Sequence, residues 1–111
     1  DLHTQSMNGG MKDLCNVMSK FLNMGMSLQD VVARTTSAPA NVIKRPELGN
    51  LSVGSEADVT VLNLRKGDFG FLDIRGTKLK GTQKVEAELT IRAGKIVWDL
   101  NAISAPMWDA K

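Results

Sequence analysis

The stretch TSAPANVIKRPELGNLSVGSEADVTVLNL, residues 36–64, contains the change of apolar period that decides the fold. Its first part predicts a short helix over residues 37–44. After Gly49 the period falls from near four residues to two, which predicts a strand over residues 58–64. The apolar residues that alternate in this strand are Val59, Val61 and Leu64. A switch from helices to strands predicts an α+β domain, or parts of two domains.

Upstream of this stretch, a helix is predicted from Met11 to about residue 24. Its apolar residues recur at spacings of three and four: Met11, Leu14, Cys15, Met18, Phe21 and Leu22. Gly25 is expected to end this helix with a positive φ, and Ser27 to cap the next one, with Asp30 three residues later. Pro39 suits the first turn of the helix at residues 37–44, and Pro46 is expected to exclude further helix.

Downstream, the clearest pattern is a hairpin of residues 85–92 and 95–99, with Ala93-Gly94 at its turn. Residues 69–74 are predicted as a separate strand. The tail has no clear period, but Trp108 predicts that it packs against something. Asp58 lies at the base of a strand, and we interpret it as a structural residue whose carboxylate accepts hydrogen bonds from turn N–H groups.

Length and composition limit the classes of protein that this chain can represent. It has 111 residues, 42% hydrophobic and 23% charged, which suits one globular domain. A net charge of +2, with bases scattered among acids, gives no support for nucleic-acid binding, and no apolar run reaches the ~20 residues of a membrane helix. A single cysteine excludes an internal disulfide. We therefore expect a cytoplasmic protein without nucleic-acid or membrane partners.

Reactive side chains are few. The only histidine is His3 and the only cysteine is Cys15, so these two cannot supply the three or four ligands of a zinc site. Cys15 falls on the apolar side of the first predicted helix, where a thiol is usually inert packing. The densest polar group is Asp1, His3, Ser6 and Asn8. From the residues alone it is either a solvated loop or the edge of a site.

Four segments share their order and pattern with one enzyme family. They are DLHT (residues 1–4), SMNGGMKDLCNVMSKFLNMGMSLQDVV (6–32), GNLSVGSEADVTVLNL (49–64) and LTIRAGKIVWD (89–99). Together they resemble the carboxyl-terminal portion of metal-dependent amidohydrolases, in the deacetylase-like and dihydroorotase-like branch. Residues 69–84 do not fit the family pattern and are interpreted as an insertion.

The resemblance implies a role for Asp1. In the family, an aspartate at this place binds the divalent metal, for which zinc is the favoured ion, and takes the proton of the attacking water. His3, Ser6 and Asn8 then become candidate substrate contacts in the loop of residues 4–10. The other metal ligands would come from histidines on earlier barrel strands and from a bridging lysine or glutamate. We therefore expect no metal bound to this piece alone, and no activity from it.

The resemblance also implies the architecture. Residues 1–45 would be the last loop and helices of a (β/α)8 barrel, and residues 46–111 the carboxyl-terminal strands of a composite β-sandwich. A chain that begins with Asp1 is then expected to be a fragment of a hydrolase acting on amide-type C–N bonds, or on a related ester or amine, of a small molecule. Its partner would be the rest of its parent chain or a second copy of itself. The alternative is a non-catalytic β-module with a helical cap that binds a protein partner.

Overall fold

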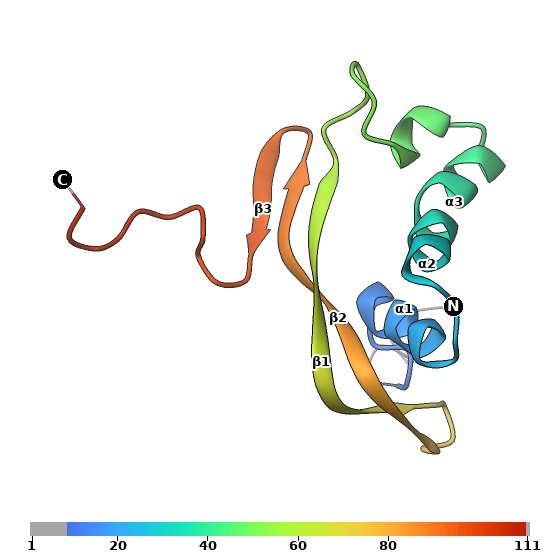
Figure 1. Ribbon diagram of the computed structural model, residues 1–111. Helices are drawn as coiled ribbons and strands as arrows, with labels where there is room; N and C mark the ends of the chain where they lie inside the picture. Colours follow the sequence, from blue (N-terminus) through green and yellow to red (C-terminus); the bar gives the residue numbers. More distant parts are fainter. Residues whose placement is uncertain (1–8, 111) are drawn as a thin grey trace.

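The computed structural model describes residues 9–110 as a mixed fold of helices followed by an antiparallel sheet. The helices are α1 (Leu14–Asn23), α2 (Leu28–Thr35), α3 (Ser37–Val42) and the 3-10 helix η1 (Pro46–Gly49). The strands are β1 (Val59–Leu72), β2 (Lys78–Arg92) and β3 (Lys95–Asp99), in the order β1-β2-β3. The helices lie to one side of the β1–β2 hairpin (Figure 1). The predicted α+β character is confirmed.

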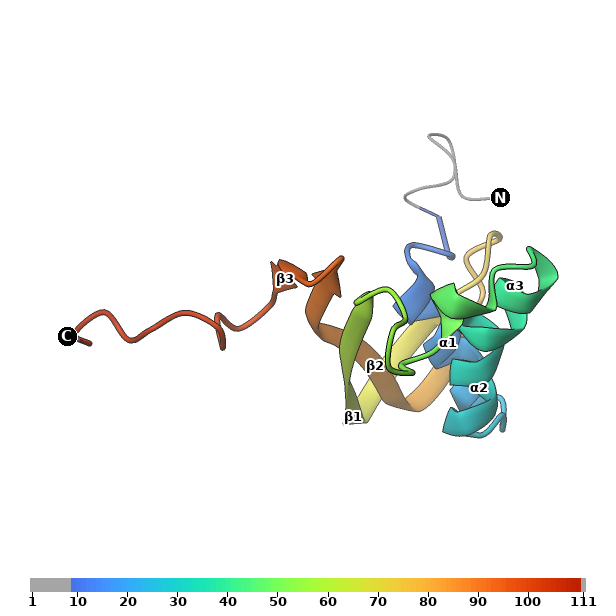
Figure 2. The same ribbon diagram turned by 90° about the horizontal axis from the view of Figure 1, so that it is seen from above.

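Seen from above, the segment after β3 extends away from the helices and the sheet (Figure 2). Its side chains are exposed, and Trp108 is 92% accessible. The prediction that Trp108 packs is therefore wrong within the described part of the chain, since no other described residue covers it. None of the helices formed by residues 9–110 has both the length and the apolar character needed to cross a membrane.

Helix α1 begins three residues later than predicted. Lys12 has a φ of 57°, and Asp13 is the N-cap, its Oδ1 accepting the N–H of Asn16 at 2.8 Å. Met11 is therefore outside the helix and exposed. The predicted end is confirmed, because Gly25 has a φ of 104°.

The next helices largely follow their predicted boundaries. The Ser27 Oγ accepts the N–H of Asp30 at 3.1 Å, which confirms the predicted cap of α2. Helix α3 begins at Ser37 but ends at Val42. The prediction that Pro46 excludes further helix is wrong, because Pro46 begins η1. Proline is tolerated there, since the first turn of a helix requires no N–H from it.

Strand β1 is longer than predicted. The two strands expected at residues 58–64 and 69–74 form one strand, and β2 begins at Lys78 rather than at Val85. Residues 69–84, interpreted as an insertion, therefore form the far end of the β1–β2 hairpin. Pairing is antiparallel throughout, with Val59 opposite Ile91 and Leu72 opposite Lys78.

The simple alternation predicted for Val59, Val61 and Leu64 is wrong. A register shift between Val61 and Leu62 changes which side chains point toward the helices. Leu62 is partly buried and packs against the core, whereas Val61 is 46% exposed. Such a shift leaves no clear mark on the sequence period, which explains why the pattern misled the prediction.

The β2–β3 turn forms as predicted, with φ of 49° at Ala93 and 79° at Gly94. The segment before β1 holds it in place. The Ala93 N–H donates to Asp58 Oδ1 at 2.8 Å, and the Gly94 N–H donates to the Ala57 carbonyl at 3.0 Å. The structural reading of Asp58 is confirmed, although the N–H group that it binds lies 35 residues away.

The core lies where α1 packs on β2. Met18 and Leu22 from α1, Val31 from α2 and Val85 from β2 form one buried cluster. Each of these side chains is at most 5% exposed. The apolar face predicted for the first helix is confirmed in part, because Met18 and Leu22 are buried, whereas Leu14 and Phe21 are 58% and 44% exposed.

Polar side chains of α1 complete the junction with β2. Strand β3 pairs with β2 only at residues 89–92 of β2, so the preceding residues of β2 have no neighbouring strand on that edge. There, Ser19 Oγ accepts the Val85 N–H at 2.9 Å, and Asn23 Nδ2 donates to the Gln83 carbonyl at 2.8 Å. Four residues of a helix rise about 6 Å and two residues of a strand about 6.7 Å, so the two spacings match. Helix α1 therefore protects this edge as a strand would.

Candidate functional site

The residues predicted to form the site all lie outside the described part of the chain. Asp1, His3, Ser6 and Asn8 belong to residues 1–8, so the structure neither groups nor separates them. Within residues 9–110, no group of three or more His, Cys, Asp or Glu side chains could hold a metal ion. The described residues thus do not fit a metal centre, and no metal chemistry can be derived from them.

The structure does show how the segment next to these residues is held. The Gly10 carbonyl oxygen accepts two hydrogen bonds from α1, from Lys20 Nζ at 2.6 Å and from Asn16 Nδ2 at 2.8 Å. Asn16 Nδ2 also reaches the Met11 carbonyl at 3.0 Å. Two consecutive peptide groups at the start of the described chain are therefore fixed to the helix.

Lys20 also joins this segment to the far end of the β1–β2 hairpin. Its Nζ donates to the Leu72 carbonyl at 2.6 Å, so one ammonium group binds two main-chain oxygens from segments 62 residues apart. Hydrogen bonds from a charged donor are among the stronger ones in proteins. Gly10 itself is buried, and a Cβ there would overlap the Leu72 carbonyl oxygen. Only glycine allows the two backbones to approach this closely.

The hairpin end that receives Lys20 is itself ordered by an aspartate. Asp73 Oδ1 accepts the N–H groups of Arg75 at 2.8 Å and Thr77 at 2.9 Å. This is the usual way in which an aspartate stabilises a turn. We call the contact among Gly10, Lys20 and Leu72 the loop anchor.

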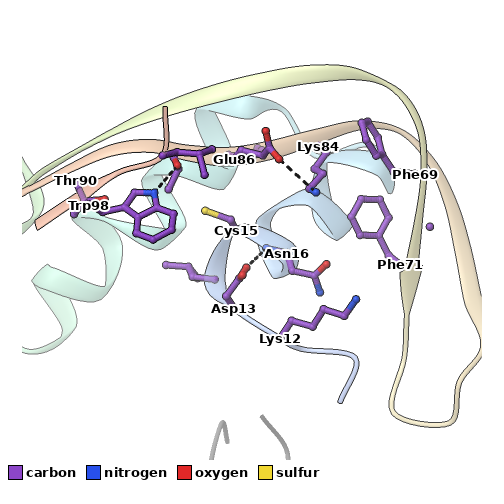
Figure 3. A pocket seen from close by; sticks show the side chains of 15 residues that line it. Lys12, Asp13, Cys15, Asn16, Phe69, Phe71, Lys84, Glu86, Thr90 and Trp98 are labelled. Atoms are coloured by element: carbon purple, nitrogen blue, oxygen red, sulfur yellow. Dashed lines mark hydrogen bonds and ion pairs between the residues drawn. The ribbon is translucent and has the colours of Figure 1, made fainter. Parts of the chain in front are cut away.

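A groove of about 590 Å³ opens beside the start of α1. Its lining comes from the residues around the start of α1, from β1 and β2, and from Trp98 in β3 and Leu100 directly after it. Figure 3 shows the indole of Trp98 at one end and the rings of Phe69 and Phe71 at the other, with Cys15 between them. Trp98 is held there by its Nε1–H, which donates to the Ala87 carbonyl at 2.9 Å.

Charges of both signs line the groove. Lys84 lies 3.6 Å from Glu86 and stacks over Phe69 at 5.7 Å from the ring centre. Glu86 also pairs with Arg65 at 3.3 Å. The groove thus has aromatic ends and a neutralised rim, which suits packing against another polypeptide segment more than recognition of a charged ligand.

Cys15 is the thiol that lines the groove, and its environment disfavours the reactive thiolate. Burial raises the pKa of the thiol, and the carboxylate of Asp13 adds to the effect, while the Ala87 N–H opposes it. A raised pKa keeps the thiol protonated at neutral pH, whereas the thiolate is the nucleophile. The interpretation of Cys15 as packing agrees with this, since it also contacts the core.

The loop anchor was not predicted from the sequence. The sequence by itself singles out neither Gly10 nor Lys20, which is one of many bases scattered among acids. The available signal was the four-residue spacing of Asn16 and Lys20, which puts both side chains on one side of α1. That spacing could have suggested a shared target but could not have named Gly10.

Comparison with known proteins shows which family the chain resembles. Residues 7–98 match the family described as "Amidohydrolase family". A deacetylase of Brucella anthropi is 41% identical over 76 residues, which are 68% of this chain and 19% of that protein. A dihydroorotase crystal structure is similar with a TM-score of 0.79 at 32% identity, covering 89% of this chain and 27% of that one.

An adenine deaminase crystal structure is similar with the same TM-score of 0.79, at 25% identity, covering 86% of this chain and 26% of that chain. The chain thus spans about a fifth of the length of the curated deacetylase and about a quarter of the two solved structures. The family match covers most of the helices and strands described above. The chain therefore belongs to the amidohydrolase family.

Proposed function

We propose that this chain is the carboxyl-terminal part of a hydrolase that cleaves amide-type C–N bonds, or a related ester or amine, in small molecules. The family match over residues 7–98 carries the proposal. The similar proteins bear the names deacetylase, dihydroorotase and adenine deaminase, which share chemistry at nitrogen-bearing carbon centres. Since one scaffold can host many substrates, the fold does not choose among them.

Within this proposal, Asp1 would be a ligand of a divalent metal, with zinc the favoured ion, and its carboxylate would accept a proton from the attacking water. His3, Ser6 and Asn8 border the substrate in the loop of residues 4–10. Residues 9–110 contain no group of three or more His, Cys, Asp or Glu side chains that could hold a metal ion, and we propose that the remaining ligands come from the rest of the parent protein. The role of this chain is then to supply one carboxylate and to hold the loop that follows it.

The proposed architecture divides the chain at about residue 45. Residues 1–45 close a (β/α)8 barrel, and residues 46–111 supply strands to a composite β-sandwich. Helix α1 and the sheet share one core, so the two parts form a continuous junction rather than separate units. A hydrolase of this design would keep its catalytic loops at one end of the barrel.

The exposed apolar surfaces support a partner for this chain. A second groove, of about 330 Å³, lies between α1 and α2 and is lined mainly by Val17, Met18, Phe21, Met26 and Val31. Phe21 is 44% exposed at this groove, and Val61 and Ile96 are about half exposed on the sheet. Exposed apolar side chains that line a groove are typical of interfaces. We propose that the rest of the parent chain covers them, and that the isolated chain instead associates with itself.

The test uses the full-length protein encoded by the complete gene, purified with zinc. It would be assayed against N-acetyl amino acids, dihydroorotate and adenine. Asp1→Asn is expected to abolish turnover and to lower bound zinc, because the amide is a poorer metal ligand than a carboxylate. Asp30→Asn removes an exposed carboxylate on α2 and is the matched control.

The alternative, a non-catalytic module that binds a protein partner, predicts a different outcome. The complete gene would then begin close to Asp1, and the purified product would neither hold zinc nor hydrolyse any of the three probes. Full activity in Asp1→Asn would separately refute the role of Asp1 while leaving the hydrolase proposal intact.

A further inference from the structure

Helix α1 carries a second apolar face beside the one that packs on β2. Successive residues of an α-helix are about 100° apart, so four of its apolar side chains fall within roughly 80° of one another on this second face. They are Leu14, Val17, Phe21 and Met24, the last being the residue that caps the helix. Leu14, Phe21 and Met24 are 58%, 44% and 61% exposed, and Val17 is half-buried. We call these four residues the α1 stripe.

The α1 stripe has the spacing of a helix–helix interface. Its members are three, four and three residues apart, which is the spacing of the a and d positions of a coiled coil. It contains no charged residue, and the polar side chains of Asn16 and Lys20 are turned toward the Gly10 carbonyl instead. No part of residues 9–110 covers the stripe, since three of its four side chains are at least 44% exposed.

This spacing reads the same in both directions, and that property identifies the occupant. In an antiparallel pair of α1 helices related by a two-fold axis, Leu14 faces Met24 of the second copy, and Val17 faces Phe21 of the second copy. Each contact then occurs twice, as a two-fold interface requires. The groove of about 330 Å³ between α1 and α2 is lined by both Val17 and Phe21. Each copy therefore presents a projecting aromatic ring and a hollow beside it on the same surface.

The size of this surface predicts a weak dimer. A stable interface usually takes about 800 Å² and 20–30 residues from each partner. The α1 stripe has four residues, and the groove beside it adds the accessible side chains of Met26, Arg34 and Thr35. That is roughly a third of the usual number. We therefore expect the dimer to form only at high protein concentration.

We propose that the 111-residue chain forms a two-fold dimer in which the α1 stripes of two copies pack against each other in antiparallel orientation. This inference specifies the self-association assigned above to the isolated chain. It rests on the proposed function only for the statement that the parent chain covers this face in the full-length protein. The chain contains its own core at the α1–β2 junction, so the dimer can be tested on the chain as it stands.

The test introduces opposite charges at two positions that face each other. Leu14→Glu puts an acid at the amino-terminal end of α1, and Met24→Lys puts a base at its carboxyl-terminal end, so the helix dipole favours both changes. In sedimentation velocity over a roughly hundredfold range of concentration, the wild type should shift from monomer to dimer by mass action. Each variant alone should raise the dimer Kd by about tenfold or more, because it brings an unpaired charge into both copies of one contact.

An equal mixture of the two variants should regain the dimer. In the mixed dimer, the introduced carboxylate and ammonium face each other at one contact, while the other contact keeps Leu14 against Met24. Recovery on mixing is specific to the antiparallel arrangement, because a parallel one would place position 14 against position 14. A dimer that persists in both single variants, or one that the mixture does not regain, would overturn the proposal.

Two control variants make the same chemical changes outside the α1 stripe. Leu51→Glu and Met107→Lys alter side chains that are 76% and 70% exposed, and the dimer Kd should stay at the wild-type value in both. Circular dichroism should be the same for all variants, since every altered side chain is mostly exposed. A Kd raised as much by Met107→Lys as by Met24→Lys would assign the dimer to the segment after β3 and refute the stripe.

The outcomes separate this inference from the proposed function. A wild-type chain that stays monomeric at every concentration would overturn the dimer, and a lower melting temperature of Met24→Lys in the full-length protein would then assign the stripe to the parent chain. Turnover and bound zinc in the full-length protein test the hydrolase independently. An inactive full-length protein, together with a dimer that the mixture regains, would refute the hydrolase and keep the dimer.

Discussion

Helix α1 and the segment that follows β3 both carry large apolar side chains, but only α1 has some that find cover in this chain. Met18 and Leu22 are each 5% exposed against β2, whereas Ile103, Met107 and Trp108 are 60–92% exposed. The segment after β3 is held by hydrogen bonds to nearby residues, since Asp99 accepts the N–H groups of Ile103 at 2.9 Å and Ser104 at 2.9 Å.

The difference shows where this chain supplies its own stability. The α1–β2 junction combines apolar burial with side chains that satisfy the strand edge, so it is complete without help. The segment after β3 and the half-exposed side of the sheet have turns and strands but no core. Apolar surface left in water contributes nothing to folding. The comparison predicts large mutational effects at the junction and small ones beyond it.

The largest expected effect comes from removing the centre of the junction. Leu22→Ala should lower the free energy of unfolding by about 3 kcal/mol, because it deletes a buried side chain and leaves a cavity. Urea unfolding followed by circular dichroism measures the change. Leu51→Ala, at a site 76% exposed, is the matched control and should change it by less than ~0.5 kcal/mol. Equal effects of Leu22→Ala and Leu51→Ala would refute the claim that stability comes from the α1–β2 junction.

Ser19→Ala tests the polar half of the junction. Ser19 is fully buried, and its Oγ is the acceptor for the Val85 N–H. Without it, that N–H stays buried and unsatisfied, at a cost of about 2 kcal/mol. Ser52→Ala, at an exposed serine, should be neutral in the same unfolding assay. A neutral Ser19→Ala would show that water replaces the hydroxyl and that α1 does not protect the strand edge.

Trp98→Phe tests the boundary between the two regions. Phenylalanine keeps most of the ring in the groove but cannot donate to the Ala87 carbonyl. The site is half exposed, so the expected loss is about 1 kcal/mol, the usual net value of one hydrogen bond. If Trp98→Phe lowered the free energy of unfolding as much as Leu22→Ala does, Trp98 would belong to the stable core rather than to the weakly covered region.

The smallest effect in the isolated chain is expected at Trp108. Trp108→Ala should change its free energy of unfolding by less than ~0.5 kcal/mol, because the side chain is almost fully exposed. In the full-length protein the same change should lower the melting temperature, if the parent chain covers this segment. Thermal unfolding of both forms gives the comparison. An effect of the same size in both would argue against such cover.

Much of the fold could be predicted, because its signals are local. Gly25, Ser27 and the Ala93-Gly94 turn act through their own backbone conformation or a side chain a few residues away, and each behaves as predicted. The predictions were wrong where contacts with distant segments determine the local structure. The register shift at Val61 and the merging of two predicted strands into β1 depend on pairing with β2, which leaves no periodic mark.

The candidate site divides in the same way. Three of the four segments that suggested the family lie almost wholly within the matched residues 7–98. The fourth, residues 1–4, lies outside that match, and the assignments to Asp1, His3, Ser6 and Asn8 remain predictions. Lys20 was missed because its importance lies in two partners, 10 and 52 residues away. The spacing of residues on α1 shows which side chains share one side of the helix. Only the folded structure shows which backbone groups those side chains contact.

The most direct test is backbone hydrogen exchange measured on the isolated 111-residue chain and on the full-length protein under the same conditions. The account predicts equal protection around Gln83 and Val85 in the two forms, since α1 satisfies that edge by itself. Residues of β3 and residues 101–110 should exchange more slowly in the full-length protein than in the isolated chain, beyond the protection that pairing with β2 and the Asp99 hydrogen bonds already give. Identical exchange of β3 and residues 101–110 in both forms would contradict the claim that the rest of the parent chain covers these surfaces.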